Sequence, residues 1–146
     1  MRARIPKYDC ASSGDAASFL TMAAQAKMRL VAIVDDDDLM RSALQGMFKS
    51  VGLLSEAFAS AEEFLKSGQQ HQTACLILDI RMQGMSGLEL QAKLNAEHCT
   101  IPIIFITAHG DTAMRMQALR AGAVEFLAKP FNDEALLGSV RATLES

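Results

Sequence analysis

The sequence has little cysteine, no excess of positive charge and no long apolar run. Its 146 residues include only three Cys, and its formal net charge is −3 with Lys and Arg spread along the chain. A membrane-spanning helix would need about 18 or more consecutive apolar residues. A nucleic-acid-binding domain would usually carry a clustered basic surface. We therefore expect neither a membrane partner nor direct nucleic acid binding.

The three cysteines, Cys10, Cys75 and Cys99, indicate a reducing environment. They are odd in number and lack the CxxC or metal-ligand spacing that would suggest a disulfide framework or a zinc site. We expect free thiols and a cytoplasmic location, with Cys75 as a small core residue.

Half of the residues are hydrophobic, which is enough for one core, and the apolar pattern begins near Met28. We therefore divide the chain into an N-terminal extension, 1–28, and a single domain, 29–146. The basic residues of the extension followed by the small residues 16–26 could imitate a signal peptide. Asp15 and Ser18 interrupt that stretch, so a weakly ordered tail or short helix is favoured. Met28 is an alternative natural start.

From Met28 onwards, short apolar runs alternate with amphipathic segments, which is typical of βα units around a parallel sheet. The expected strands are 30–34, 53–59 (more polar, hence an edge), 75–78, 103–106 and 124–128. The expected helices follow each strand, at 38–51, 61–68, 86–97, 111–122 and from 132 to the end of the domain. This pattern predicts a three-layer α/β domain.

Local residue choices support these helices. Asp38 is expected to cap the first helix, with Leu39, Leu44, Met47 and Phe48 on its buried face. Further caps are expected at Ser60, which would accept from the amide of Glu63, and at Asp111 and Asn132.

Polar side chains stand where the apolar runs end. Asp79 ends the most apolar run, Asp35 and Asp36 follow the first, Thr107 ends the fourth and Lys129 follows the fifth. Ligands of open parallel sheets bind at the carboxyl ends of the strands. Carboxylates, a hydroxyl and an ammonium gathered there suit Mg2+-assisted phosphoryl transfer.

These segments, in this order, resemble the receiver domain of bacterial two-component response regulators. The matching stretches are Val34-Asp35-Asp36, Leu78-Asp79-Ile80-Arg81-Met82 with Ser86-Gly87, Ile106-Thr107-Ala108, and Ala128-Lys129-Pro130-Phe131. The resemblance covers residues 29–145. It implies a flavodoxin-like (βα)5 fold with strand order 2-1-3-4-5, a cis peptide bond at Lys129-Pro130, and phosphorylation of Asp79 by a sensor histidine kinase.

The resemblance also implies roles for individual residues. Mg2+ (or Mn2+) would be bound by Asp36, Asp79 and the backbone carbonyl of Arg81, with Asp35 acting through water. Lys129 would contact the phosphoryl oxygens. Such a receiver phosphorylates and dephosphorylates itself and is not a turnover enzyme.

The resemblance also implies a conformational switch. Thr107 would follow the phosphate and Phe126 would turn inward, while Arg81 and His109 would tune the rate of dephosphorylation. The helix at 111–122, the strand at 124–128 and the last helix would then form a face for homodimer formation or output, with Met114, Met116 and Leu119 as adaptable contacts.

Two features qualify the resemblance. Gln83 stands where the family usually has Pro, which predicts a less rigid loop after Asp79. The wording of the last two motifs resembles receivers that precede a LuxR-type helix-turn-helix domain. The chain is therefore expected to be either a stand-alone receiver or a fragment of a transcription regulator.

Three other functions compete with this one. A pseudo-receiver, which would act only by protein interaction, would not need the complete set Asp35, Asp36, Asp79, Thr107 and Lys129. A haloacid-dehalogenase-like enzyme would use Asp35-Asp36-Asp37 and leave Asp79 without a role. A flavin-binding relative would have to place a phosphate beside four consecutive Asp residues.

Overall fold

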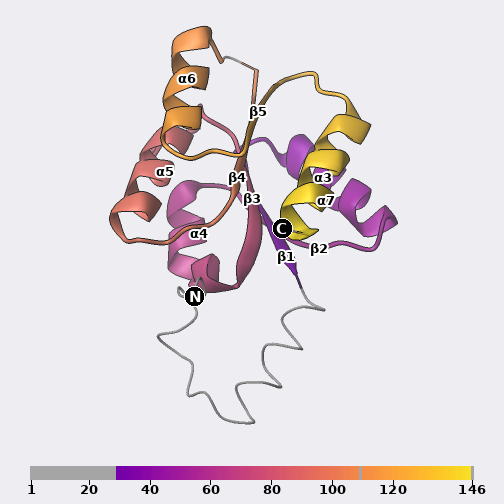
Figure 1. The fold of residues 1–146 in the computed structure, drawn as a ribbon. Helices are drawn as coiled ribbons and strands as arrows, with labels where there is room; N and C mark the ends of the chain where they lie inside the picture. Colours follow the sequence, from indigo (N-terminus) through magenta and orange to yellow (C-terminus); the bar gives the residue numbers. More distant parts are fainter. Residues whose placement is uncertain (1–28, 109, 146) are drawn as a thin grey trace.

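A computed structural model describes residues 29–108 and 110–145 of the chain, and its fold is a five-stranded parallel sheet between two layers of helices (Figure 1). The N-terminal extension lies outside the described residues, as does His109. The elements in chain order are β1 (Leu30–Val34), α3 (Asp38–Ser50), β2 (Leu54–Phe58), α4 (Ala61–Ser67), η1 (Gln69–Gln72), β3 (Thr73–Leu78), α5 (Gly87–Ala96), β4 (Ile103–Thr107), α6 (Thr112–Arg120), β5 (Glu125–Ala128) and α7 (Asp133–Glu145).

The strand order is β2-β1-β3-β4-β5, as the resemblance implied. Each strand pairs in parallel with its neighbours, so all five carboxyl ends meet at one edge of the sheet. The register brings Val34 beside Leu78 and aligns Thr107 with Ala128. The polar residues at these strand ends, or directly after them, therefore lie near one another.

The two faces of the sheet bury different residues because side chains alternate along a strand. In β1, Val31 and Ile33 pack with α3 and α7, whereas Ala32 and Val34 pack on the face covered by α4, α5 and α6. All five residues of β1 are buried. Such a continuous apolar strand is characteristic of a sheet covered on both sides.

The start of α3 corrects two expectations. Its N-cap is Asp37, whose side chain accepts from the amides of Leu39 and Met40, and Asp38 is the first helical residue. Leu39 is 81% exposed rather than buried. Five residues at about 100° each place it roughly 140° around the helix from Leu44, so Met40 joins the buried face instead.

The other expected caps are present. Ser60 accepts from the amide of Glu63, Asp111 from that of Met114, and Asn132 from that of Ala135. Ser86 and Glu89 form a reciprocal capping box at the start of α5, which was not among the caps expected from the sequence.

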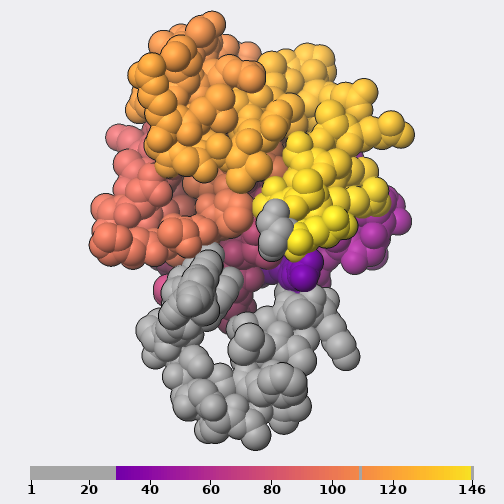
Figure 2. Space-filling view, in the orientation of Figure 1, coloured from indigo at the N-terminus to yellow at the C-terminus, as the bar shows by residue number. Residues whose placement is uncertain are grey.

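The helices α6 and α7 lie on opposite sides of the sheet, beside the strand edge formed by β5. Figure 2 shows α6, in orange, forming one end of the molecular surface.

Among the residues described, no helix has the length and apolar character needed to cross a membrane.

Candidate functional site

The carboxyl edge of the sheet gathers three carboxylates. Asp35 and Asp36 follow β1, and Asp79 follows β3. One oxygen atom from each lies within 4.8 Å of the others, a spacing that allows a single cation to contact all three. Asp35 and Asp79 are buried while Asp36 is exposed. The cluster is therefore open to solvent on the side of Asp36.

Lys129 extends from the end of β5 into this cluster. Its Nζ lies 3.0 Å from Oδ2 of Asp35 and 3.6 Å from Oδ2 of Asp79. Its backbone amide also donates to the carbonyl of Thr107, which ties the ends of β4 and β5 together. The Lys129-Pro130 peptide bond is cis, as expected from the resemblance.

The surroundings of Asp79 oppose its ionisation. Burial raises the pKa of the Asp79 carboxyl, and the negative charge of Asp35 raises it further. Lys129, the amide of Ile80 and the hydroxyl of Thr107 each act in the opposite direction without cancelling the increase. An additional cation among the carboxylates would favour the ionised form.

The carboxylates around Lys129 favour its charged form. Burial alone would lower the pKa of its ammonium, but the hydrogen bond and the charge of Asp35, joined by those of Asp79, raise it overall. Lys129 therefore remains charged beside the two carboxylates.

Asp35 is already held by the protein through both oxygens. Its Oδ1 accepts from the amide of Asp37 at 2.9 Å, and its Oδ2 accepts from Lys129. Arg41 supports the same turn: it donates to the backbone carbonyl of Asp35 at 2.6 Å and forms an ion pair with Asp38. Nothing local in the sequence predicts the contact of Arg41 with the Asp35 carbonyl.

The loop that follows Asp79 closes back on its strand. The amide of Gly87 donates to the carbonyl of Ile80 at 2.8 Å. A Cβ at Gly87 would lie 2.2 Å from the carbonyl oxygen of Asp79, so only glycine permits this approach. A cleft of about 540 Å3 runs beside the loop, lined by Asp36, Ile80, Arg81, Met82, Gln83, Ser86, Leu88 and Met114.

Phe126 and Thr107 lie next to each other beyond the carboxylates. Phe126 is 6% exposed and Thr107 is 1% exposed. Atoms of both side chains lie within 3 Å of where a Cβ at Gly110 would stand. The two residues expected to act as a switch are thus in one small region, and Phe126 is inward in this structure. His109, the expected partner of Arg81 in rate tuning, lies outside the described residues.

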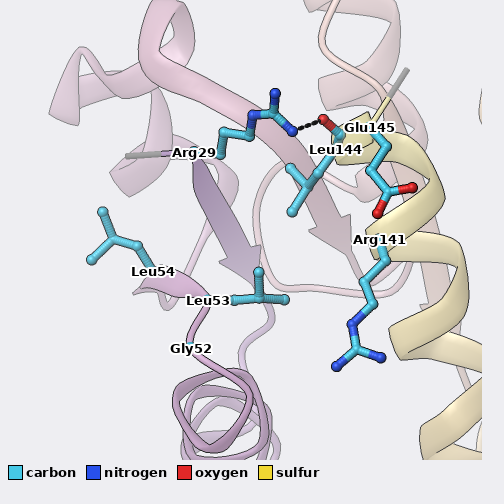
Figure 3. Close-up of a pocket in the computed structure, with 7 residues that line it drawn as sticks. All are labelled: Arg29, Gly52, Leu53, Leu54, Arg141, Leu144 and Glu145. Atoms are coloured by element: carbon cyan, nitrogen blue, oxygen red, sulfur yellow. Dashed lines mark hydrogen bonds between the residues drawn. The ribbon is translucent and has the colours of Figure 1, made fainter. Parts of the chain in front are cut away.

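A second cleft, of about 230 Å3, lies at the opposite, amino edge of the sheet (Figure 3). Arg29 donates to the carbonyl of Leu144 across it, and Arg141 and Leu53 also line it. None of the expected site residues takes part in this cleft.

Comparison with known proteins defines the class of this domain. Residues 31–141 match the family model of the response regulator receiver domain. The chain therefore belongs to the family of response regulator receiver domains, which act in phosphorelay signalling and are not turnover enzymes.

Individual relatives are similar in sequence and in structure. The chain is 49% identical over 116 residues to nodulation protein W of Bradyrhizobium diazoefficiens and 47% identical to response regulator protein TodT of Pseudomonas putida, covering 80% of this chain and 51% of each relative. The response regulator StyR matches with a TM-score of 0.76 and 47% identity over 81% of this chain and 60% of that one. The crystal structure of FixJ-N matches with a TM-score of 0.72 and 37% identity over 80% of this chain and 94% of that one. The chain thus spans about half the length of these curated relatives.

Proposed function

We propose that Asp79 accepts a phosphoryl group from a phosphohistidine of a cognate histidine kinase. The observation that carries this proposal is the convergence of three carboxylates with Lys129 at the carboxyl edge of the sheet. A carboxylate oxygen of Asp79 attacks phosphorus, the P–N bond breaks, and the donor imidazole leaves. Lys129 neutralises charge on the transferred oxygens as the bond changes.

A divalent cation, Mg2+ or Mn2+, is part of this proposal. Oxygen ligands at this spacing fit such an ion. Asp36, Asp79 and the backbone carbonyl of Arg81 would hold it, while Asp35, whose oxygens already accept from protein donors, would act through water. Its chemistry is to offset the repulsion between the carboxylates and the incoming phosphoryl group.

The signal would leave through Thr107 and Phe126. With phosphate on Asp79, the Thr107 hydroxyl exchanges its bond to the carboxylate for one to a phosphoryl oxygen. Phe126, which is already inward in this structure, would pack behind the moved hydroxyl, and α6, β5 and α7 would change as an output or homodimer face. Arg81 and His109 would set the dephosphorylation rate.

The wider context is also proposed. The matched relatives include the transcriptional regulatory protein FixJ of Azorhizobium caulinodans, which supports a link to transcription control. We assign residues 29–146 to the receiver, residues 1–28 to an extension, and the whole to the cytoplasm.

Intact-mass measurement with a small-molecule phosphodonor tests the proposal. The natural chain should gain one phosphoryl group only when Mg2+ is present, and Asp79→Asn should gain none. Asp133→Asn, which removes an exposed carboxylate in the first turn of α7 and outside the cluster, should behave as the natural chain does. A folded natural chain that gains no phosphoryl group would instead favour the pseudo-receiver function.

A further inference from the structure

The loop at 81–86 departs from the pattern that the resemblance implies, because Gln83 stands where the family usually has proline. Arg81 and Gln83 line the same cleft as Asp36. The path of this loop therefore decides where the Arg81 carbonyl stands relative to the carboxylates. Proline at position 83 would restrict the backbone there, and glutamine does not.

A side chain from another element supports this loop. Glu62, in the first turn of α4, accepts a hydrogen bond from the backbone amide of Met85 at 2.9 Å, across 23 residues of sequence. The same interaction, followed by that with its own amide, lowers the pKa of the Glu62 carboxyl. Glu62 is thus an ionised acceptor facing the loop.

Gly84 makes room for this contact. Its φ is +78°, in the left-handed region that favours glycine, and a Cβ there would lie 2.7 Å from Oε2 of Glu62. Gly84 therefore allows the backbone to turn and leaves room for the Glu62 carboxylate. Glu62 holds the loop at the amide of Met85, and the hydrogen bond from the Gly87 amide to the Ile80 carbonyl closes the base of the loop.

We propose that Glu62 is a positioning residue that holds the 81–86 loop so that the Arg81 carbonyl faces the acidic cluster, replacing the restraint that proline would give at position 83. The inference rests on the proposed function, since it concerns the cation site. Glu62 itself touches neither the cation nor the phosphoryl group.

The chain offers a closely matched control in Glu63. Both residues are exposed acids in the first turn of α4, so each contributes a similar charge to the helix terminus. Glu63 accepts from the amide of Ala59, outside the loop. Glu62→Ala and Glu63→Ala thus make the same chemical change, and only the first releases the loop.

The experiment uses the full chain and two measurements, neither of which needs phosphorylation. Calorimetric titration gives the Kd for Mg2+, and NMR hydrogen exchange without metal reports the Met85 amide. In Glu62→Ala we expect faster exchange at Met85 and a rise in Kd of about three- to tenfold, the size of one lost hydrogen bond. Glu63→Ala should leave both measurements unchanged, and its Tm provides the reference for folding.

Two further variants separate positioning from general destabilisation. Glu62→Gln keeps an acceptor oxygen and should preserve the Kd. Adding Gln83→Pro to Glu62→Ala should restore the Kd, because the proline restrains the loop without Glu62.

Each alternative result has a definite meaning. A Kd for Glu62→Ala within about twofold of the natural value overturns the inference while leaving the cation site intact. A rise in Kd that persists both in Glu62→Gln and after Gln83→Pro is added to Glu62→Ala also overturns it. If the natural chain binds no Mg2+, the proposed function fails and this inference fails with it.

Discussion

The helices α6 and α7 both follow strands that end at the functional site, yet they are held by different forces. The 13 residues of α7 bury Leu136, Val140 and Leu144 against the sheet. The nine residues of α6 bury only Ala118. Apolar burial scales with the area removed from water, so α7 has much more to lose by moving.

Side-chain hydrogen bonds from α5, rather than buried apolar side chains of its own, hold α6 in place. The side-chain amide of Gln91 in α5 donates to the carbonyl of Ala118 at 2.9 Å, and Asn95 donates to that of Ala121 at 3.0 Å. Met116 and Leu119 remain 45% and 38% exposed. A few directional bonds can be exchanged at low cost, which makes α6 better suited than α7 to respond to the site.

The largest effect should come from removing an anchor of α7. Leu136→Ala deletes a fully buried side chain, and we expect a loss of about 2–5 kcal/mol in the free energy of unfolding. Leu119→Ala, the same change on α6, should cost less than about 1 kcal/mol. Urea denaturation measures both, and equal losses would contradict the contrast between the helices.

A smaller effect is expected at the hydrogen-bonded contact of α6. Gln91→Ala should lower the free energy of unfolding by about 0.5–1.5 kcal/mol, because a buried bond is lost. Hydrogen exchange should become faster in α6 but not in α7. The exposed Gln117→Ala provides the control, and the idea fails if exchange in α6 is the same in both variants.

Removing the Asp79 carboxylate should have a modest effect of the opposite sign, namely an increase in folding stability. Because the folded-state pKa of Asp79 is raised, the folded chain binds its proton more tightly than the unfolded chain does. Stability is therefore lost as pH rises from the unfolded pKa through the folded one, and this cost persists at neutral pH.

Replacing the carboxylate should remove that cost. In EDTA, Asp79→Asn should have a higher Tm than the natural chain at pH 7.5, and the difference should shrink towards pH 4. A lower Tm for Asp79→Asn at neutral pH would contradict the assignment of electrostatic cost to Asp79.

The smallest effect is predicted for the surface of α6. Met116→Ser should change the free energy of unfolding by no more than about 0.5 kcal/mol, since its side chain is 45% exposed. Denaturant titration checks this value. A loss of more than about 1 kcal/mol would show that α6 is anchored through Met116 as well.

The sequence allowed most of this architecture to be predicted. Apolar runs and turn glycines indicated the individual strands and helices, because the periodicity of a strand or helix is a local property of the sequence. The strand order depends on pairing between distant segments, and it was implied by the resemblance that the order of the motifs carries. The error at Leu39 arose where the helix boundary was one residue uncertain. An exposed leucine and a buried one look alike in sequence when the phase of a helix is assigned by inspection.

Contacts between distant elements could not be predicted in this way. The bond from Glu62 to Met85 and the bond from Gln91 to Ala118 each join a side chain to a backbone group. A backbone amide or carbonyl has no identity in the sequence, so no residue pattern marks its partner. The capping box at Ser86 and Glu89 is different, since both residues belong to one short segment and their spacing is visible in the sequence.

The ion pair of Lys129 with Asp35 and Asp79 also has a consequence for charge balance. With Asp36, the cluster contains three carboxylates and one ammonium, which leaves two negative charges. A single divalent cation brings that total to zero. The incoming phosphoryl group would then meet a locally neutral surface, and its own charge would become the only excess that the domain must redistribute.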